Sequence, residues 1–399
     1  MEELISYQSK LLHQIDNDWQ RYLFPELKKG ARLLGIKGLR GVGKTTMFLQ
    51  YLAFEYEERK NGLYVTADHP YFYRNSLFEL ASEWSGYGGT LLLIDEVHKY
   101  PNWSRELKLI YDGHPDLTVY FTSSSALDLY RGESDLSRRL LTHTLHGLSF
   151  REFLLFRHGI SFQRFDLTEI INKHVQITAE LTRNIKILPL FEEYLVDGYF
   201  PFSRDIEPET FIPRLIQLIN TVLESDLASI EGYSASNVRK IKRLLGVIAE
   251  TAPFEPNISK IAEKLQLGRN TVNDYLKNLH DAQVLQLLRK PAKGNAQLKK
   301  PDKIYFENTS LAYAFQNSPE KGTIRETFFM NQLKNAGYLV EISPTRSDFL
   351  VDRQYTFEVG GKNKDRKQIK NIEQSYMAID AIEYGFAETI PLWLFGLMY

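Results

Sequence analysis

The residues of this sequence best suited to chemistry form a glycine-rich stretch that ends in one lysine and two threonines. Residues 38–46 have the sequence G-L-R-G-V-G-K-T-T, which fits the phosphate-loop pattern G-x-x-x-x-G-K-[ST] without a gap. Glycine lets backbone N–H groups approach phosphate oxygens closely, and the helix that follows adds the positive end of its dipole. We therefore expect a nucleoside triphosphate to contact Gly38, Arg40, Gly41, Val42, Gly43, Lys44, Thr45 and Thr46.

Two carboxylates follow a continuous apolar run at residues 91–94, which is typical of a buried parallel strand. Such a strand delivers the side chains at its carboxyl end to the ligand site, so Asp95 and Glu96 are expected beside the phosphate loop. In that arrangement Lys44 holds the β- and γ-phosphates, while Thr45 binds Mg²⁺ directly and Asp95 holds it through water. Glu96 then acts as the general base that activates water. The expected ligands are ATP or its product ADP, and Mg²⁺.

Two further side chains fit catalytic roles, each with a plain structural alternative. Residues 117–121 predict a strand, and Thr122 at its end stands where a polar group would contact the γ-phosphate. A serine-rich turn after the strand explains the same residue equally well. Residues 135–139 contain two arginines, and Arg139 could neutralise charge in the transition state. Surface arginines are common, so the spacing alone does not establish this role.

A parallel sheet is needed to hold these residues together. We expect strands at residues 33–36, 63–67, 91–96, 117–121 and 141–145, and helices at residues 5–19, 47–60, 76–84, 103–111 and 126–130. This alternation predicts an α/β ATPase domain over residues 1–148. His98, in the loop after the two acids, is expected to be structural.

Composition is that of a globular protein with no global basicity. The 399 residues are enough for two or three domains, with 43% hydrophobic and 25% charged residues. Lys and Arg number 49 against 50 Asp and Glu, so any surface for nucleic acid has to be local. There is no cysteine, no signal-peptide pattern and no apolar run that could span a bilayer. We therefore expect a cytoplasmic protein without membrane contact.

The middle of the chain predicts helices followed by a winged helix. Residues 149–235 have helical periodicity and suggest a lid or linker. Over residues 236–320 we expect helices at 237–252 (capped by Ser236), 259–265 (capped by Asn257) and 269–280, then strands at 284–288 and 304–306 around a basic loop. Residues suited to DNA are Arg269, Asn270, Asn273 and Lys277 on the second helix of the motif, and Arg289, Lys290, Lys293, Lys299, Lys300 and Lys303 in the wing. The alternative, equally weighted, is a lid that docks on the nucleotide domain.

The tail, residues 321–399, predicts a helix at 323–335, strands at 338–342, 347–351 and 355–359, a helix at 369–379 and a strand at 391–395. This order resembles the restriction-endonuclease-like, or PD-(D/E)xK, core. The resemblance implies a second Mg²⁺ site at Glu326, Asp348 and Glu358. Its lysine position is Gly360, and Lys362 would substitute only if the glycine turn brings it back. We therefore expect no DNA cleavage, and a fold retained for docking.

The phosphate loop, residues 91–99, Thr122 with its following serines, Arg139 and residues 148–153 together resemble a family of prokaryotic AAA-type ATPases with a C-terminal domain of unknown function. The resemblance covers nearly the whole chain and implies a P-loop sheet of strand order 5-1-4-3-2. Arg138 stands where the family has Gly, and Ser123 where it has Gly after the sensor threonine. The leading interpretation is an Mg²⁺-dependent ATPase that switches its C-terminal modules on DNA. An ATP-gated signalling scaffold and an ATP-regulated nuclease are the alternatives, and no protein partner is indicated.

Overall fold

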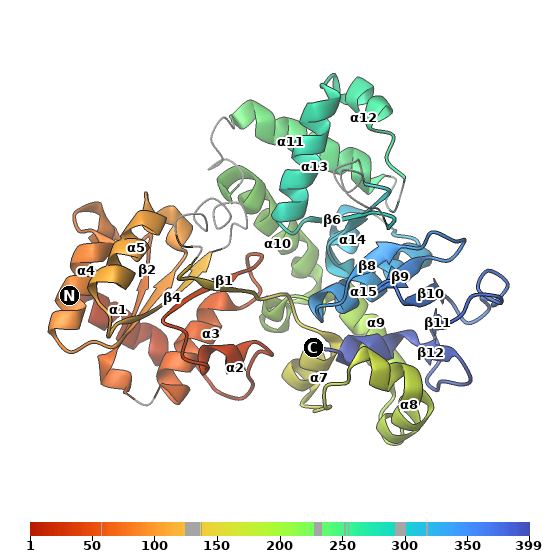
Figure 1. The fold of residues 1–399 in the computed structure, drawn as a ribbon, viewed down its shortest axis with the longest axis horizontal. Coiled ribbons are helices and arrows are strands. Elements are labelled where there is room, and N and C mark those ends of the chain that lie inside the picture. The colour runs from red at the N-terminus through yellow and green to blue at the C-terminus, as the bar shows by residue number, and fades with distance from the viewer. Residues whose placement is uncertain are drawn as a thin grey trace. The chain divides into compact units, whose positions relative to one another are not determined.

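The structure is a computed structural model of the chain, and it describes all residues except 57, 124–135, 137, 227–233, 251–252, 254, 292–300 and 317. Two compact units are present (Figure 1). Unit 1 comprises residues 1–147 with 225–232, and unit 2 comprises residues 148–224 with 233–399. In the part of the chain that is described, no helix is long and apolar enough to cross a membrane.

A five-stranded, all-parallel sheet forms the centre of unit 1, in the order β2-β3-β4-β1-β5. Counted from the other edge this order is 5-1-4-3-2, so the predicted arrangement is confirmed. The strands are β1 (Leu33–Lys37), β2 (Gly62–Thr66), β3 (Leu91–Asp95), β4 (Thr118–Ser123) and β5 (Leu141–Thr144). β3 is buried along its whole length, which explains its continuous apolar sequence.

Helices complete the core of unit 1. They are α1 (Glu2–Leu12), α2 (Phe24–Leu27), α3 (Lys44–Gln50), α4 (Leu77–Gly86) and α5 (Trp103–Gly113), with a π-helical turn at Tyr51–Glu55 and 3₁₀ turns at Arg59–Asn61, Pro70–Tyr73 and Val97–Lys99. Leu80 of α4 and Leu107 of α5 are buried in the same core as Leu92 of β3. Ser76 caps α4, because its hydroxyl accepts the N–H of Glu79 at 3.0 Å.

Two predicted helices of unit 1 are shorter than expected. The first ends at Leu12 rather than residue 19, since the Asp-rich stretch after it favours turns. The second changes from α-helix to a π-helical turn after Gln50 and ends at Glu55, whose carboxylate pairs with Lys28 at 2.5 Å. The predicted helix at 126–130 lies outside the described residues.

Unit 2 begins with the helices predicted for residues 149–230. They are α7 (Phe150–His158), α8 (Leu167–Leu181), α9 (Ile187–Asp197) and α10 (Pro208–Thr221), with further short turns at Pro201–Asp205 and Val222–Asp226. Ser149 caps α7 through a capping box with Glu152. Aromatic rings join these helices to the tail, because Phe191 of α9 lies 5.3 Å from Phe150 and 4.8 Å from Phe328, centroid to centroid.

Residues 235–306 form three helices and a two-stranded antiparallel sheet, which we call the helix–hairpin segment. Its elements are α11 (Ala235–Ala249), α12 (Ile258–Leu265), α13 (Arg269–Asp281), β6 (Leu285–Leu288) and β7 (Lys303–Phe306). Asn257 caps α12 as predicted, accepting the N–H of Lys260 at 3.1 Å. The prediction for Ser236 was wrong, because α11 already begins at Ala235 and its N-cap residue is Ser234.

The tail packs one helix with a five-stranded sheet of order β12-β11-β10-β9-β8. Helix α14 (Thr309–Phe315) precedes the tail, whose helix is α15 (Lys321–Asn335) and whose strands are β8 (Val340–Ile342), β9 (Phe349–Val351), β10 (Tyr355–Gly360), β11 (Ser375–Ile379) and β12 (Thr389–Pro391), followed by a 3₁₀ turn at Leu392–Leu397. β8, β9 and β10 are antiparallel neighbours, while β10, β11 and β12 run parallel.

The predicted helix at 369–379 was wrong, because its second half is strand β11. Met377 and Ile379 alternate along this strand and enter one small core with Ile369. The helix-like spacing of Ile369 and Ile372 instead marks a single turn, in which Ile372 N–H donates to Ile369 O at 3.0 Å. The predicted last strand was also misplaced, since the chain is in β12 only to Pro391.

A buried polar network joins the helix–hairpin segment to the tail. Gln286 of β6 donates to the carboxylate of Glu307 and accepts from the ammonium of Lys334 on α15. Ile342 N–H of β8 adds a backbone bond to Arg289 O at 2.9 Å. Burial raises the pKa of Glu307 to about 7, with Lys334 as an opposing influence, so this joint is sensitive to pH.

Replacing Glu307 by Gln tests that joint. The raised pKa means that folded protein binds more protons than unfolded protein between roughly pH 4.5 and 7, so the free energy of unfolding falls as pH rises through that window. We expect this loss to reach about 3 kcal/mol in the wild type and to be much smaller in Glu307→Gln. Denaturant unfolding of both proteins across pH 4.5–8 measures it. Parallel pH curves for the two proteins would contradict the assignment.

Candidate functional site

The phosphate loop joins β1 to α3 through residues with left-handed backbone. Gly41 has φ 79° and Gly43, the N-cap residue of α3, has φ 95°, conformations that glycine adopts without strain. Gly38 faces a different constraint, because a Cβ there would lie 2.3 Å from the carbonyl oxygen of Leu145. Lys44 is 5% exposed, and its ammonium donates to Gly38 O at 2.8 Å and Leu39 O at 3.1 Å. The Lys44 ammonium is therefore held by carbonyl oxygens of the phosphate loop itself.

Asp95 accepts three hydroxyl hydrogen bonds at the end of β3. Thr45 Oγ1 of α3 donates to it at 2.6 Å and the Tyr64 hydroxyl of β2 at 2.9 Å, while Thr122 of β4 donates to its other oxygen. The side chains predicted to hold Mg²⁺ and to sense the γ-phosphate thus meet at one carboxylate. Burial, reinforced by Asp95, raises the pKa of Tyr64, so this phenol stays a donor.

Glu96 lies next to this cluster in an unusual backbone conformation. Its φ is 52°, a left-handed value rare for a residue with a side chain and often found at functional sites. Its N–H donates to Thr122 Oγ1 at 3.0 Å. Its carboxylate lies 3.5 Å from the Arg40 guanidinium, 3.7 Å from His98 Nε2 and 3.9 Å from the Lys99 ammonium. Three basic side chains therefore surround the Glu96 carboxylate.

Sequence reasoning missed Tyr64, which belongs to no motif and lies in the middle of β2. His98, expected to be structural, follows the end of β3 in the turn Val97–Lys99. Arg139 forms a two-pronged ion pair with Asp112 of α5, at 2.9 and 3.1 Å, rather than with a residue of the phosphate loop. Ser123 lies 3.3 Å from His98 Nδ1, while Ser124 and Ser125 lie outside the described residues.

Oxygen donors at the Thr45–Asp95 pair suit Mg²⁺. This ion takes one or two protein oxygens and completes its shell with water and substrate phosphates in nucleotide enzymes. Neither side chain needs to move far, since the hydroxyl and carboxylate oxygens are already 2.6 Å apart. When bound, the ion would neutralise charge on the β- and γ-phosphates.

Family comparisons agree with this geometry. Residues 30–154 match the family model described as an AAA domain. The chain carries an AAA-type P-loop ATPase domain. Residues 188–321 match a second model, described as a domain of unknown function (DUF8612). The AAA domain thus provides nucleotide binding and ATP hydrolase chemistry in general terms, and the predicted resemblance is confirmed.

Individual relatives are distant. The protein described as "Uncharacterized protein MJ1637" of Methanocaldococcus jannaschii is 22% identical over 375 residues, 86% of this chain and 78% of that protein. Two solved structures are the replication initiator DnaA bound to AMPPCP and single-stranded DNA (17% identity, TM-score 0.27, 65% of this chain and 86% of that chain) and AMPPCP-bound DnaA from Aquifex aeolicus (15%, 0.24, 70% and 88%). TM-scores this low carry no argument, so the chemistry rests on the site itself.

The acids of the tail form a second polar site in unit 2. Glu326 of α15 accepts the Tyr305 hydroxyl at 2.7 Å and the Lys303 ammonium at 3.2 Å. Asp348 accepts Val359 N–H at 2.8 Å. Burial, followed by the charges of Glu326 and Glu358, raises the pKa of Asp348 to about 7. The carboxylates therefore interact.

Lys364, not Lys362, supplies the ammonium beside Glu358. Glu358 is fully buried, and the Lys364 Nζ lies 2.5 Å from its Oε1. Gly360 makes this possible, because a Cβ at that position would lie 2.6 Å from Cβ and Cγ of Lys364. The stem of Lys364 thus covers the place where a side chain at 360 would stand. Lys362 is exposed.

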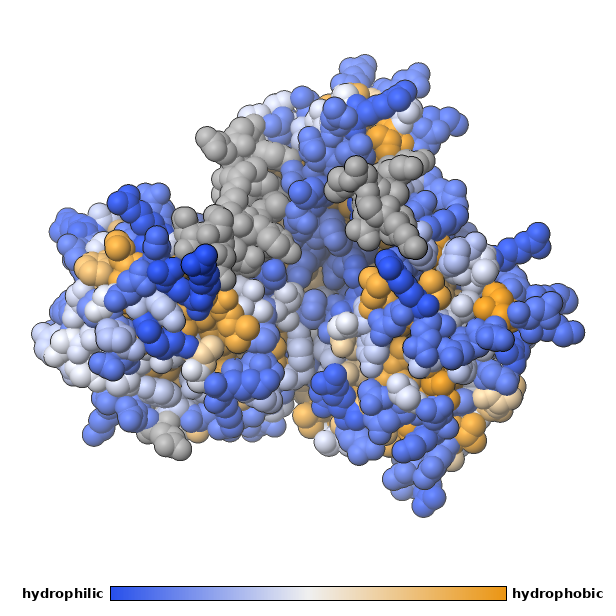
Figure 2. Space-filling model, viewed as in Figure 1, coloured by the Kyte–Doolittle hydropathy of each residue, from blue (hydrophilic) through white to orange (hydrophobic). Residues whose placement is uncertain are grey.

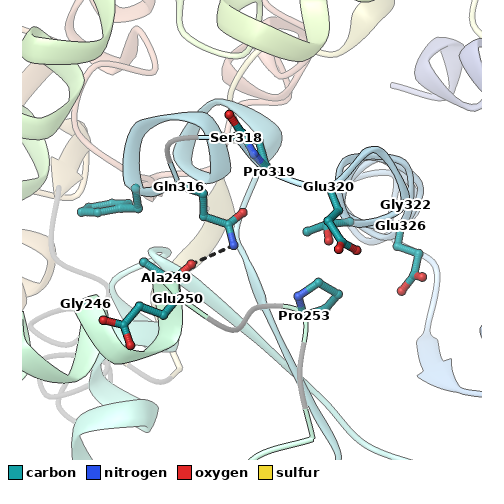
Figure 3. Close-up of a pocket in the computed structure, with 12 residues that line it drawn as sticks. Gly246, Ala249, Glu250, Pro253, Gln316, Ser318, Pro319, Glu320, Gly322 and Glu326 are labelled. Atoms are coloured by element: carbon teal, nitrogen blue, oxygen red, sulfur yellow. Dashed lines mark hydrogen bonds between the residues drawn. The ribbon is translucent and has the colours of Figure 1, made fainter.

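This second site lacks a ready set of metal ligands. Within the described residues, no group of three or more His, Cys, Asp or Glu side chains is arranged to hold a metal ion. Glu326 also lines a cavity of about 650 Å³, together with Glu320 and with Glu250, the C-cap residue of α11 (Figure 3). Because carboxylates line this cavity, it favours cations over phosphates.

Five of the residues predicted to meet DNA lie on the surface of unit 2. Arg269, Asn270, Asn273 and Lys277 are exposed on α13, opposite its buried apolar side, and Lys290 is exposed after β6. Figure 2 shows mainly hydrophilic side chains over α12 and α13 on the face drawn. Lys303 instead pairs with Glu326, and Lys293, Lys299 and Lys300 lie outside the described residues.

Substitutions at Lys44 and Glu96 separate binding from hydrolysis. Lys44→Ala should weaken ATP binding by roughly 100-fold, because a charge-assisted bond to phosphate is lost. Glu96→Gln should bind ATP with nearly unchanged affinity and lower kcat by about 10²- to 10⁴-fold, because only water activation needs the carboxylate. Titration with a fluorescent ATP analogue and steady-state phosphate release measure the two effects. Glu83→Gln, an exposed change on α4, is the control. Wild-type turnover by Glu96→Gln would show that another group is the base.

Proposed function

We propose that this protein is an Mg²⁺-dependent ATPase that uses ATP binding and hydrolysis to switch its C-terminal modules on DNA. The observation that carries the ATPase part is the meeting of Thr45, Tyr64 and Thr122 on the carboxylate of Asp95. Elements far apart in sequence deliver these groups to the edge where the phosphate loop lies. No other described cluster of the chain combines a phosphate loop with polar strand ends.

In this proposal each side chain has one task. Lys44 moves from the loop carbonyls to the β- and γ-phosphates, which offer a stronger, charged acceptor. Thr45 and Asp95 hold Mg²⁺, and Thr122 orients both Asp95 and the backbone of Glu96. Glu96 takes the proton of the attacking water. When ATP is bound, the Arg40 guanidinium can pair either with the Glu96 carboxylate or with the ATP phosphates.

The DNA part rests on the helix–hairpin segment, which we propose is a winged helix. Its exposed α13 face offers cationic and amide side chains of the kind that meet phosphates and base edges. The alternative, a lid on the AAA domain, needs the same face for protein contact. Salt dependence distinguishes the two, because only DNA binding releases condensed counterions.

Charge reversal on that face tests the DNA proposal. Replacing Arg269, Lys277 and Lys290 by Glu should weaken binding to duplex DNA by at least about 100-fold and reduce the slope of log K against log salt by about 3. Lys173→Glu, an exposed reversal on α8, should leave both quantities unchanged. Fluorescence anisotropy of a labelled duplex, measured between about 50 and 200 mM salt, gives the slopes. Identical slopes for wild type and triple variant would favour the lid.

A second candidate, phosphodiester cleavage by the tail, is favoured by the Lys364–Glu358 ion pair. A nuclease of this type needs carboxylates for Mg²⁺ and a lysine beside them to offset developing charge. Against it, each of Glu326 and Glu358 already has a lysine partner, and the acids do not form a ligand group. We therefore keep docking as the main role of the tail.

Plasmid and linear DNA incubated with pure protein in Mg²⁺ or Mn²⁺ decide between these roles. We expect no cutting above the level of the Asp348→Ala/Glu358→Ala control. Cutting by wild type that is lost in Lys364→Ala and kept in Lys362→Ala would instead establish a nuclease with Lys364 in the catalytic site.

A further inference from the structure

Arg21 lies between the phosphate loop and residues 146–147 of unit 1. Its side chain is buried, with 3% of the residue exposed. One guanidinium nitrogen donates to Val42 O in the loop, and another donates to His146 O at 2.7 Å and Gly147 O at 3.0 Å. The guanidinium is planar and its donors have fixed directions. A shift of any one carbonyl therefore changes the bonds to the others.

Tyr22 adds a second link to the same segment. Its hydroxyl donates to Thr144 O at 2.7 Å and accepts the N–H of His146 at 3.2 Å. The Arg21 guanidinium carbon lies 5.7 Å from the centroid of the Tyr22 ring. The two neighbouring side chains thus hold consecutive peptides of residues 144–147.

Backbone contacts join the loop and this segment directly. Leu145 N–H donates to Lys37 O at 2.8 Å, immediately before the phosphate loop. Gly38 lies so close to Leu145 O that a side chain at 38 would collide with it. Residue 147 is the last of this part of unit 1, and residue 148 is the first of unit 2. The segment that contacts the loop is therefore also the segment through which the chain passes from unit 1 into unit 2.

We infer that Arg21 and Tyr22 are positioning residues that couple the nucleotide state of the phosphate loop to residues 144–147. The inference rests on the proposed function, because it requires ATP at the loop. Val42 lies between two left-handed glycines, so phosphates that draw in their N–H groups reorient the Val42 peptide. Its carbonyl then changes its bond to Arg21, and the same guanidinium holds His146 and Gly147. Differential contacts of this kind are what lets a ligand shift a distant equilibrium.

Hydrogen exchange of the full chain with Mg²⁺ and either ATPγS or ADP tests the coupling. In the wild type, amides of residues 144–148 should exchange about 5- to 30-fold differently between the two nucleotides, the factor that one or two hydrogen bonds provide. Arg21→Met removes all donors at similar length and should abolish that difference. Tyr22→Phe, which keeps the ring, should reduce it by about half on a logarithmic scale. Arg32, the residue before β1, donates to Tyr111 O. Arg32→Met is the matched control and should keep the exchange difference of residues 144–148.

The outcomes separate this inference from the proposed function. Nucleotide protection of the phosphate loop and ATP turnover are measured on the same samples. Turnover with the same 144–148 exchange difference in wild type, Arg21→Met and Tyr22→Phe would overturn the coupling and leave the ATPase intact. Turnover without any such difference in the wild type would also overturn it. No nucleotide protection and no turnover in the wild type would overturn the proposed function itself.

Discussion

The AAA domain depends on one constraint: the buried carboxylate of Asp95 needs hydrogen-bond donors, and these come from three other elements. Asp95 ends the most buried strand of the sheet and is 3% exposed, so its charge needs hydrogen bonds. Thr45, Tyr64 and Thr122 provide them. The strand order meets this demand, because β3 has β2 and β4 as neighbours and β4 pairs with β1, which leads into the phosphate loop. The same bonds place Glu96 through the backbone.

In unit 2, hydrogen bonds among buried polar groups connect structural modules. Glu307 and Gln286 are buried and Lys334 is partly exposed, and hydrogen bonds connect the three side chains between the helix–hairpin segment and the tail. Lys303 and Tyr305 of β7 bind Glu326 of α15 in a similar way. Polar groups buried together are costly when separated, so these modules are expected to move as one body. A switch driven by ATP would then displace that body as a whole, and residues 144–147 are the natural place for the motion to begin.

Sequence reasoning succeeded where local pattern and chemistry agree. The phosphate loop, β3 with Asp95 and Glu96, and the cap at Asn257 follow from motif, burial or capping rules, while the sheet order was implied by the resemblance to AAA-type ATPases. It failed where tertiary contacts override spacing, as at residues 369–379, whose isoleucine spacing imitates a helix. Lys364 was missed because a turn, not strand register, brings it to Glu358. Arg21 has no motif at all, since its role depends on carbonyls more than 100 residues away as well as on the loop.

The most direct measurement is steady-state phosphate release by the purified chain, with and without Mg²⁺ and with and without duplex DNA at low salt. We expect turnover that requires Mg²⁺ and changes by at least about twofold when DNA is bound, because we propose that the ATP state is coupled to the C-terminal modules. Turnover that is equal with and without Mg²⁺, or no turnover under any of these conditions, would show that the protein is not an Mg²⁺-dependent ATPase.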